Sequence, residues 1–225
     1  RGLGDVYKRQ ILDIKRDGRV KVRIVKIGFL ENVVDADGAH FCYYSAVTRL
    51  SSVRMLLFRS NQCGDDFATI DLDTAFLQSD PYKDGKFKYC WVKNPITKEI
   101  LLFKQYSCIY GERSAPKRWF TTITPCFREM GFIQGSNEEC IFFNPKTGLR
   151  VLIYVDDLAI AGKRKDIEDF VATLRKRFKA KEVMWLTETT PIDFVGMIIG
   201  KTANRVWLSM ESYIDKVIQN LDPES

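Results

Sequence analysis

The chain contains the segment Val151-Leu-Ile-Tyr-Val-Asp-Asp-Leu-Ala-Ile-Ala161, in which the carboxylates of Asp156 and Asp157 stand side by side between two apolar runs. The apolar runs predict two buried strands joined as a hairpin. Ionised carboxylates at the end of a buried strand are costly unless a cation neutralises them. The segment therefore predicts a cation site at the tip of the hairpin. A plain hairpin turn is the alternative, because Asp is frequent in turns.

The residue types around the acids indicate which cation would bind. The segment holds neither His nor Cys, and oxygen ligands alone favour Mg²⁺ or Mn²⁺ over zinc. Asp71 ends a second apolar run, Phe67-Ala-Thr-Ile-Asp71. A sheet that places this run beside the hairpin would gather three carboxylates, an arrangement that holds two metal ions in phosphoryl transfer. Polymerases, nucleases and phosphatases share this chemistry, so the carboxylates alone do not choose among them.

Composition narrows the class of protein. The chain has 225 residues and is 45% hydrophobic, enough for one large domain or two small ones. A net charge of +6 is compatible with a polyanionic partner. Six cysteines without a Cys-x-x-Cys pair indicate reduced structural thiols in an intracellular protein rather than a zinc knuckle or a disulfide framework. No apolar run reaches the ~20 residues of a membrane span, so no membrane contact is expected.

Both ends of the chain predict truncation. Residues 1–10 can be encoded by a sequence that resembles an in-frame sequencing adapter, and we exclude them from fold reasoning as a library scar. A genuine basic N-terminus is the alternative. The abrupt end at 223–225, directly after an amphipathic stretch, suggests that the other terminus is cut as well.

Hydrophobic periodicity predicts a mixed fold. Strands are expected at 19–28, 67–72, 89–92, 140–143, in the hairpin 151–161, and in a second hairpin formed by 193–199 and 205–208. Helices are expected at 48–58, from 115 toward 131, at 165–178 and at 212–221, and Pro125 is expected to kink or stop the second of them. This order of elements predicts an α+β layer with helices on one face of an antiparallel sheet.

The segments that begin at Asp71, Ser107 and Tyr154 resemble, in this order, the central motifs of the reverse transcriptases of copia-type retrotransposons. The first is Asp71-Leu-Asp-Thr-Ala-Phe-Leu77, similar to the family's Asp-Val-Lys-Thr-Ala-Phe-Leu. The second lies within Ser107-Cys-Ile-Tyr-Gly-Glu-Arg-Ser-Ala-Pro-Lys-Arg-Trp-Phe120, similar to Leu-Tyr-Gly-Leu-Lys-Gln-Ala-Pro-Arg-x-Trp. The third begins at Tyr154 and is similar to Tyr-Val-Asp-Asp-Leu-x-Ile-Ala-Gly. Lys21-Val-Arg-Ile-Val-Lys-Ile-Gly-Phe29 is also similar to the family's Lys-Ala-Arg-Leu-Val-Ala-Lys-Gly-Phe, and the resemblance covers nearly all of 11–221.

The resemblance implies a right-hand polymerase fold. The palm would be a ferredoxin-like antiparallel sheet with helices on one face, next to a fingers part, and the thumb would be mostly absent. In sequence, the fingers-like part would span 11–66 and the palm 67–199. Residues 200–225 would hold the end of the primer-grip hairpin and the truncated start of the thumb or connection.

The resemblance also assigns residues to roles. Asp71, Asp156 and Asp157 would be the catalytic acids and the ligands of two Mg²⁺ ions, with Mn²⁺ as a substitute. The nucleotide-binding residues would be Arg23, Lys26, Arg54, Leu72, Phe76, Tyr110 and Gly111. The primer and template would contact Tyr154, Phe194, Val195 and Gly196. The ring of Phe76 would exclude a 2′-hydroxyl by steric clash, while an ordinary core position is its alternative.

The activity implied is RNA-directed DNA polymerisation, by attack of a primer 3′-hydroxyl on a deoxynucleotide. The partners would be a primed RNA or DNA template, deoxynucleotide triphosphates, and the ribonuclease H and integrase parts of a polyprotein, in a cytoplasmic virus-like particle. Two departures from the family pattern stand out: Asp73 replaces a Lys, and Glu112-Arg-Ser114 replaces Leu-Lys-Gln. A catalytically inactive, nucleic-acid-binding remnant of such an element is therefore a second hypothesis. An unrelated metal-dependent phosphatase or nuclease is a third.

Overall fold

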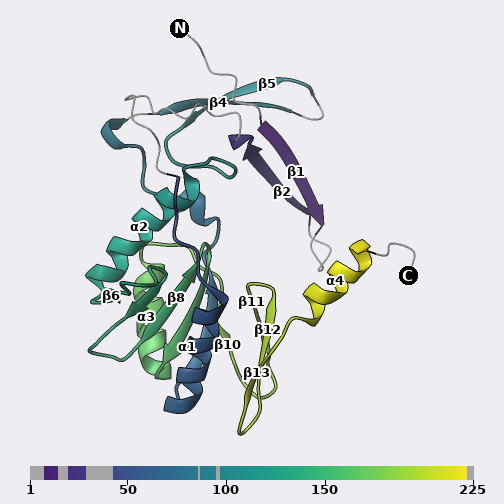
Figure 1. Ribbon diagram of the computed structural model, residues 1–225. Helices are drawn as coiled ribbons and strands as arrows, with labels where there is room; N and C mark the ends of the chain where they lie inside the picture. The colour runs from purple at the N-terminus through teal and green to yellow at the C-terminus, as the bar shows by residue number, and fades with distance from the viewer. Residues whose placement is uncertain (1–7, 15–19, 29–42, 86, 95–96, 222–225) are drawn as a thin grey trace. The chain divides into compact units, whose positions relative to one another are not determined.

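The computed structural model describes residues 8–14, 20–28, 43–85, 87–94 and 97–221 (Figure 1). The chain divides into two compact units. One comprises Arg1–Ser45 and Thr74–Pro125, and the other comprises Ala46–Asp73 and Cys126–Ser225. Both units are discontinuous in sequence, whereas the division expected from the sequence is consecutive. The names fingers and palm for the expected ranges stay predictions.

The second unit is built on a six-stranded antiparallel sheet, in agreement with the predicted α+β fold. Its strand order is β10-β3-β9-β8-β7-β6. The strands are β3 (Asp66–Asp71), β6 (Ile133–Gln134), β7 (Ile141–Phe143), β8 (Arg150–Tyr154), β9 (Asp157–Gly162) and β10 (Met184–Trp185). β8 and β9 form the predicted hairpin, and β3 pairs with β9 along its whole length. The strand of Asp71 therefore lies beside the hairpin, as the argument from the acids requires.

Helices pack on both faces of this sheet. Phe67, Leu152 and Ala159 point to one face, where they form a hydrophobic core with α1 (Leu50–Cys63). On the other face Phe142 packs edge-on against Phe127, near the end of α2 (Ala115–Glu129), with ring centroids 5.0 Å apart. Phe127 also contacts α3 (Arg164–Arg175) through the ring of Phe170. The expected single helical face therefore holds for the end of α2 and for α3, while α1 lies on the opposite face.

A separate three-stranded sheet and a final helix complete the second unit. The sheet contains β11 (Ile192–Phe194), β12 (Met197–Lys201) and β13 (Val206–Ser209), followed by α4 (Glu211–Leu221). The prediction of one strand over 193–199 is wrong. Val195 and Gly196 both have positive φ, 55° and 74°, and turn the chain so that Phe194 pairs with Met197. This turn lets both β11 and β12 bury side chains in the core shared with α1.

The first unit contains two antiparallel ribbons. β1 (Lys8–Ile14) pairs with β2 (Val20–Lys26), and β4 (Lys88–Lys93) pairs with β5 (Ile100–Gln105). Two short 3₁₀ helices cover Ala75–Gln78 and Lys83–Gly85. β1 includes the last three residues of the segment 1–10, whose origin stays a prediction.

α2 begins in the first unit and ends in the second. Of the two predicted effects of Pro125, a kink or a stop, the stop is wrong, because the helix continues to Glu129. Pro125 is exposed, so its ring meets solvent rather than the core, and only one backbone donor is lost. In the described part of the chain the five cysteines are free thiols, and no helix there has the length and apolar character needed to cross a membrane.

Candidate active site

The three predicted acids meet at one end of the six-stranded sheet. Asp71, the last residue of β3, lies directly opposite Asp157, the first residue of β9. Opposed residues of an antiparallel pair project from the same face with Cβ atoms about 4.5–5.5 Å apart. Asp156 lies in the turn, and its carbonyl oxygen accepts a hydrogen bond of 2.7 Å from the backbone N–H of Leu72. All three acids are partly buried and lie at the same end of the sheet.

The turn that carries Asp156 is strained. Val155 and Asp156 form a two-residue loop between the paired residues Tyr154 and Asp157. Val155 has a φ of 56°, a region that a β-branched residue rarely adopts. In hairpins, a positive φ at the first loop residue alone belongs to the type II′ pattern, in which glycine is preferred. Backbone strain of this kind concentrates at functional sites.

The acids also disfavour one another's charge. The pKa of Asp157 is raised from 3.8 to about 6, first by burial and then by the nearby carboxylates of Asp156 and Asp71. Lys181 partly offsets this rise, and Asp193 of β11 adds to it. A nearby cation would stabilise the ionised form of such a carboxylate, because its positive charge offsets the repulsion from the neighbouring carboxylates.

A lysine already neutralises part of this charge. The ammonium group of Lys181 donates a hydrogen bond to Oδ2 of Asp71 and forms an ion pair with it. This hydrogen bond raises the pKa of Lys181, together with the charges of Asp71, Asp73 and Asp157. Lys181 was not among the residues predicted from the sequence.

The donor set fits the divalent cation that the sequence predicts, although the donors are not gathered around one point. In the part of the chain that the structure describes, no three His, Cys, Asp or Glu side chains are placed so that they could hold a metal ion. The available donors at the sheet edge are carboxylate oxygens, the ligands that Mg²⁺ and Mn²⁺ prefer. The Lys181 ammonium shows that Asp71 accepts a cationic partner. Asp71, Asp156 and Asp157 are therefore chemically suited to the ion.

The predicted primer and template residues differ in how accessible they are. Phe194 is 1% exposed and belongs to the hydrophobic core, so its side chain cannot reach a ligand. Gly196 is exposed and Val195 partly so, which leaves the β11–β12 turn as the accessible part of this segment. The backbone N–H of Gly196 donates to the carboxylate of Asp193, 3.2 Å away. Tyr154 is partly buried at the end of β8, next to the acids in sequence.

Two predicted nucleotide-binding residues lie in the same unit as the acids. Leu72 is completely buried, so only its backbone could contact a ligand, and its N–H is already donated to Asp156. Arg54 is exposed on α1.

The other nucleotide-binding candidates belong to the first unit. Phe76 is partly buried and packs edge-on against Tyr110, with ring centroids 5.5 Å apart. Gly111 has a φ of 82°, and a Cβ there would stand 2.0 Å from the carbonyl oxygen of Lys26. Glycine therefore lets the backbone at position 111 lie close to the backbone of β2. The N–H of Lys26 in β2 also donates a hydrogen bond to the carbonyl oxygen of Tyr110. Arg23 lies in β2, and its side chain is outside the described residues.

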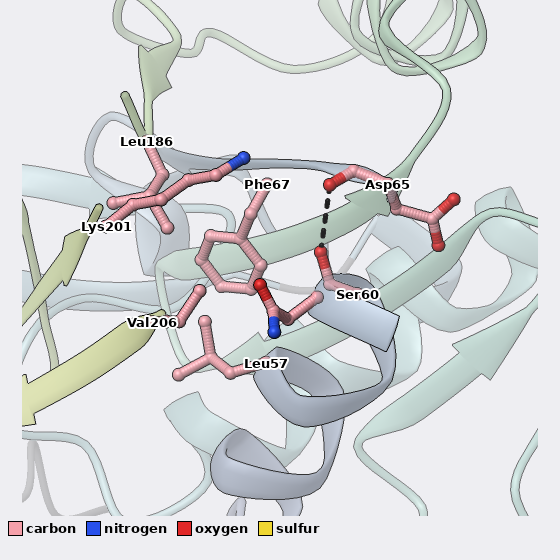
Figure 2. Close-up of a pocket in the computed structure, with 8 residues that line it drawn as sticks. Leu57, Ser60, Asp65, Phe67, Leu186, Lys201 and Val206 are labelled. Carbon is pink, nitrogen blue, oxygen red and sulfur yellow. Dashed lines mark hydrogen bonds between the residues drawn. The ribbon is translucent and has the colours of Figure 1, made fainter. Parts of the chain in front are cut away.

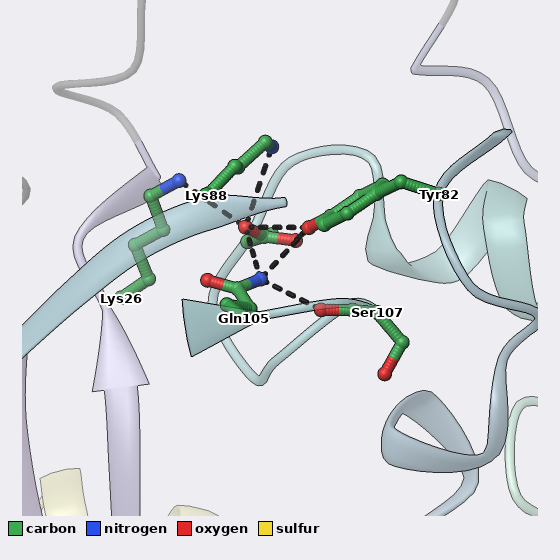
Figure 3. Close-up of polar contacts among 6 residues, drawn as sticks. Lys26, Tyr82, Lys88, Gln105 and Ser107 are labelled. Atoms are coloured by element: carbon green, nitrogen blue, oxygen red, sulfur yellow. Dashed lines mark hydrogen bonds and ion pairs between the residues drawn. The ribbon is translucent and has the colours of Figure 1, made fainter. Parts of the chain in front are cut away.

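Lys26 takes part in a buried polar cluster. Its ammonium lies 3.2 Å from Oε1 of Glu112, whose side chain is completely buried. Figure 3 shows Lys26, Lys88, Tyr82 and Gln105 converging on this carboxylate. The Lys88 ammonium lies 3.5 Å from Oε1 of Glu112, and the Gln105 amide donates a hydrogen bond of 2.8 Å to the same oxygen. Because Lys26 is only 5% exposed, its ammonium neutralises the carboxylate of Glu112 and is not presented at the protein surface.

The cluster explains a departure from the family pattern. Burial alone would raise the pKa of Glu112, but Lys88, Lys26 and the hydrogen bond from Gln105 outweigh it and lower the pKa. In the family motifs quoted above, Ala stands at the position of Lys26 and Leu at the position of Glu112. Lys26 and Glu112, which both depart from the family pattern, therefore form one buried ion pair in which each charge compensates the other.

A small pocket lies at the opposite end of β3 from Asp71. It is lined by Leu57, Ser60, Asn61, Asp65, Phe67, Leu186, Lys201 and Val206. Figure 2 shows the Phe67 ring between Leu57 and Leu186, with the Ser60 hydroxyl donating to the backbone carbonyl of Asp65. The carboxylate of Asp65 pairs with Arg150, so the pocket offers no cluster of unpaired acids.

The sequence contained little that could have identified Lys181 or Asp193. Lys181 is 110 residues from Asp71 and lies in a run of mixed charge after α3. Asp193 is the first residue of a predicted strand and carries no motif of its own. Glu112 was visible as a departure from the family pattern, but its burial could not be read from its neighbours.

Comparison with known proteins supports the resemblance noted in the sequence. The model of the family described as reverse transcriptase (RNA-dependent DNA polymerase) matches residues 2–223. The chain is 25% identical to the retrovirus-related Pol polyprotein from transposon TNT 1-94 of Nicotiana tabacum, over 94% of the chain. It is 24% identical to the corresponding polyprotein from transposon RE1 of Arabidopsis thaliana, over 73% of the chain. The chain spans only 16% and 11% of the length of these relatives.

A solved structure is similar in fold. Telomerase from Candida albicans, determined with a fragment of telomeric RNA, matches with a TM-score of 0.50 and 13% sequence identity. The match covers 88% of this chain and 46% of the telomerase chain. At this level of identity the likeness concerns the fold, and it agrees with the mixed helical and antiparallel architecture described above.

Proposed function

Because the chain belongs to the reverse transcriptase (RNA-dependent DNA polymerase) family and is of the copia type, we propose that it is the polymerase region of a retrotransposon Pol polyprotein. In this proposal it extends a primer with deoxynucleotides on an RNA or DNA template. The observation that carries the proposal is the pairing of Asp71 with Asp157 on adjacent strands, with Asp156 in the turn between β8 and β9.

The acids would hold the reacting groups at the sheet edge. Asp71 and Asp156 would be the principal ligands of Mg²⁺ or Mn²⁺, and Asp157 would complete the negatively charged edge. When bound, the metal supplies charge neutralisation on the phosphates and lowers the pKa of the primer hydroxyl. The raised pKa of Asp157 supports this role, because burial and like charges prepare the edge for a cation.

Phe76 would select the sugar. Its ring is held edge-on by Tyr110, which limits its movement. A ring fixed under the sugar of an incoming nucleotide would clash with a 2′-hydroxyl, so deoxynucleotides would be preferred. Gly111 would contribute by keeping the backbone of the second motif close to β2.

The test is primer extension on an RNA template by the 225-residue chain. We expect template-dependent addition of deoxynucleotides that requires Mg²⁺ or Mn²⁺ and is lost in Asp156→Asn. Asp169→Asn on the exposed face of α3 is the matched control, since it removes the same charge away from the site. Extension that survives Asp156→Asn would refute the assigned site.

A non-catalytic remnant that binds nucleic acid is the second candidate. It is favoured by Asp73, which adds negative charge beside the acids where the family has a lysine, and by the ion pair that engages Asp71. Folded wild-type chain that binds a primed template but adds no nucleotide would support this candidate.

The partners and location of the chain follow from the same proposal. A primed template, deoxynucleotide triphosphates and the ribonuclease H and integrase parts of a polyprotein would be its partners. Its location in a cytoplasmic virus-like particle stays a prediction.

A further inference from the structure

Lys181 is positioned by the backbone rather than by its side chain alone. Its N–H donates to the carbonyl oxygen of Asp71 over 2.9 Å, and the N–H of Asp73 donates to Lys179 over the same distance. Between these bonds Leu72 and Ala180 form an antiparallel bridge. The segment 179–181 therefore continues the sheet edge beside Asp71, and the lysine stem starts next to the carboxylate that it binds.

The charges around Lys181 favour its position. Its ammonium pairs with Asp71, and Asp73 and Asp157 also attract it. The side chain of Lys181 is 49% exposed and that of Asp71 is 37% exposed, so solvent reaches both groups. A solvent-exposed ion pair between flexible side chains is weak and can be exchanged for another partner.

A divalent cation and an ammonium group cannot share the same carboxylate oxygen at low cost. Two positive charges a few ångströms apart repel each other, so each lowers the affinity of the carboxylate for the other. Binding of a cation at Asp71 therefore favours withdrawal of Lys181 toward solvent, where its four-carbon stem can move freely.

We propose that Lys181 is a built-in counter-ion that competes with the divalent cation for Asp71 and so sets the affinity of the site. This inference rests on the proposed function, because it assumes that Asp71 is a metal ligand. Lys181 acts through Asp71 and is a positioning residue. It keeps the carboxylate oriented at the sheet edge and yields it when the cation binds.

The test measures Mn²⁺ binding by electron paramagnetic resonance for the wild-type chain and for Lys181→Met, which keeps an unbranched side chain and removes its charge. Because an exposed pair is worth about 0.2–1 kcal/mol, Mn²⁺ should bind roughly 1.4- to fivefold more tightly to this variant. Lys179→Met is the matched control, since it removes the same charge from the same exposed segment. Lys181→Arg, which keeps a cation at Asp71, should bind Mn²⁺ no more tightly than the wild type. Thermal melting shows whether each variant is folded.

The outcomes separate this inference from the proposed function. A gain in affinity for Lys181→Met that clearly exceeds the gain for Lys179→Met supports competition at Asp71. Equal gains in Mn²⁺ affinity for the two variants would mean that removing any nearby positive charge has the same effect. The counter-ion inference would then fail, while the proposed metal site would stand. If neither the wild type nor Lys181→Met binds Mn²⁺ at millimolar concentration, the proposed metal site fails, and the inference fails with it.

Discussion

Replacing Asp157 by Asn should stabilise the chain, and the gain should depend on pH. The substitution keeps the shape of the side chain and removes a charge that the fold disfavours. The pKa of this carboxyl is raised from 3.8 to about 6 by burial and by Asp156 and Asp71. The folded state therefore holds a proton more tightly than the unfolded state, and wild-type stability falls as the pH rises from about 4 through about 6.

The size of the effect follows from the same values. The interval between 3.8 and about 6 corresponds to at most about 3 kcal/mol at pH 7.5, where Asp157 is ionised in both states. Because the side chain is only partly buried, solvent screening reduces the expected gain to about 2 kcal/mol. At pH 4 the carboxyl is mostly protonated in the folded state, and the gain should shrink to about 0.5 kcal/mol or less.

Urea unfolding followed by circular dichroism measures this difference. Wild type, Asp157→Asn and the control Asp169→Asn are compared between pH 4 and pH 8 with EDTA present, so that no divalent cation contributes. Asp169→Asn, on the exposed face of α3, shows how much the removal of one carboxylate charge changes the free energy of unfolding away from the site. A gain for Asp157→Asn that does not vary with pH, or a loss of stability at pH 7.5, would refute the electrostatic reasoning.

Three further predictions follow from other parts of the structure. Glu112→Leu should lower the free energy of unfolding by about 3–5 kcal/mol because it leaves Lys26 buried without its partner, and the double variant with Lys26→Met should recover most of this loss in urea unfolding. Val155→Gly should raise the free energy of unfolding by about 0.5–1 kcal/mol by relieving the positive φ, and a loss of stability would show that the turn is not strained. Phe76→Ala should raise incorporation of ribonucleotides relative to deoxynucleotides about tenfold or more in primer extension, and an unchanged ratio would assign Phe76 to the core alone.

Much of the fold was predictable because its signals are local. The hairpin 151–161 and the strand before Asp71 are continuous apolar runs, and the structure confirms them as β8, β9 and β3. α3 was predicted from an apolar stripe at helical spacing, and the four side chains that it buries, Ile167, Phe170, Val171 and Leu174, belong to that stripe.

Other features depended on tertiary contacts that override local preference. Val195 is a good strand former, yet it has a positive φ and lies in a turn. The residues that flank this turn, Phe194 and Met197, are both buried in the core. Pro125 predicted a kink or stop in its helix, yet α2 continues because that position faces solvent.

The candidate site shows the same division. By itself the sequence determined the chemistry of the opening hairpin: adjacent acids at the end of buried strands, a third acid in Asp71, and the family to which the motifs belong. Only the tertiary structure decided which groups face these acids. Lys181 reaches Asp71 through a backbone bridge between segments 110 residues apart, and Glu112 is balanced by Lys26 from a strand 86 residues away. Carboxylates at strand ends can be read from neighbouring residues, whereas the cations that balance them come from distant parts of the chain, so their pairing exists only after folding.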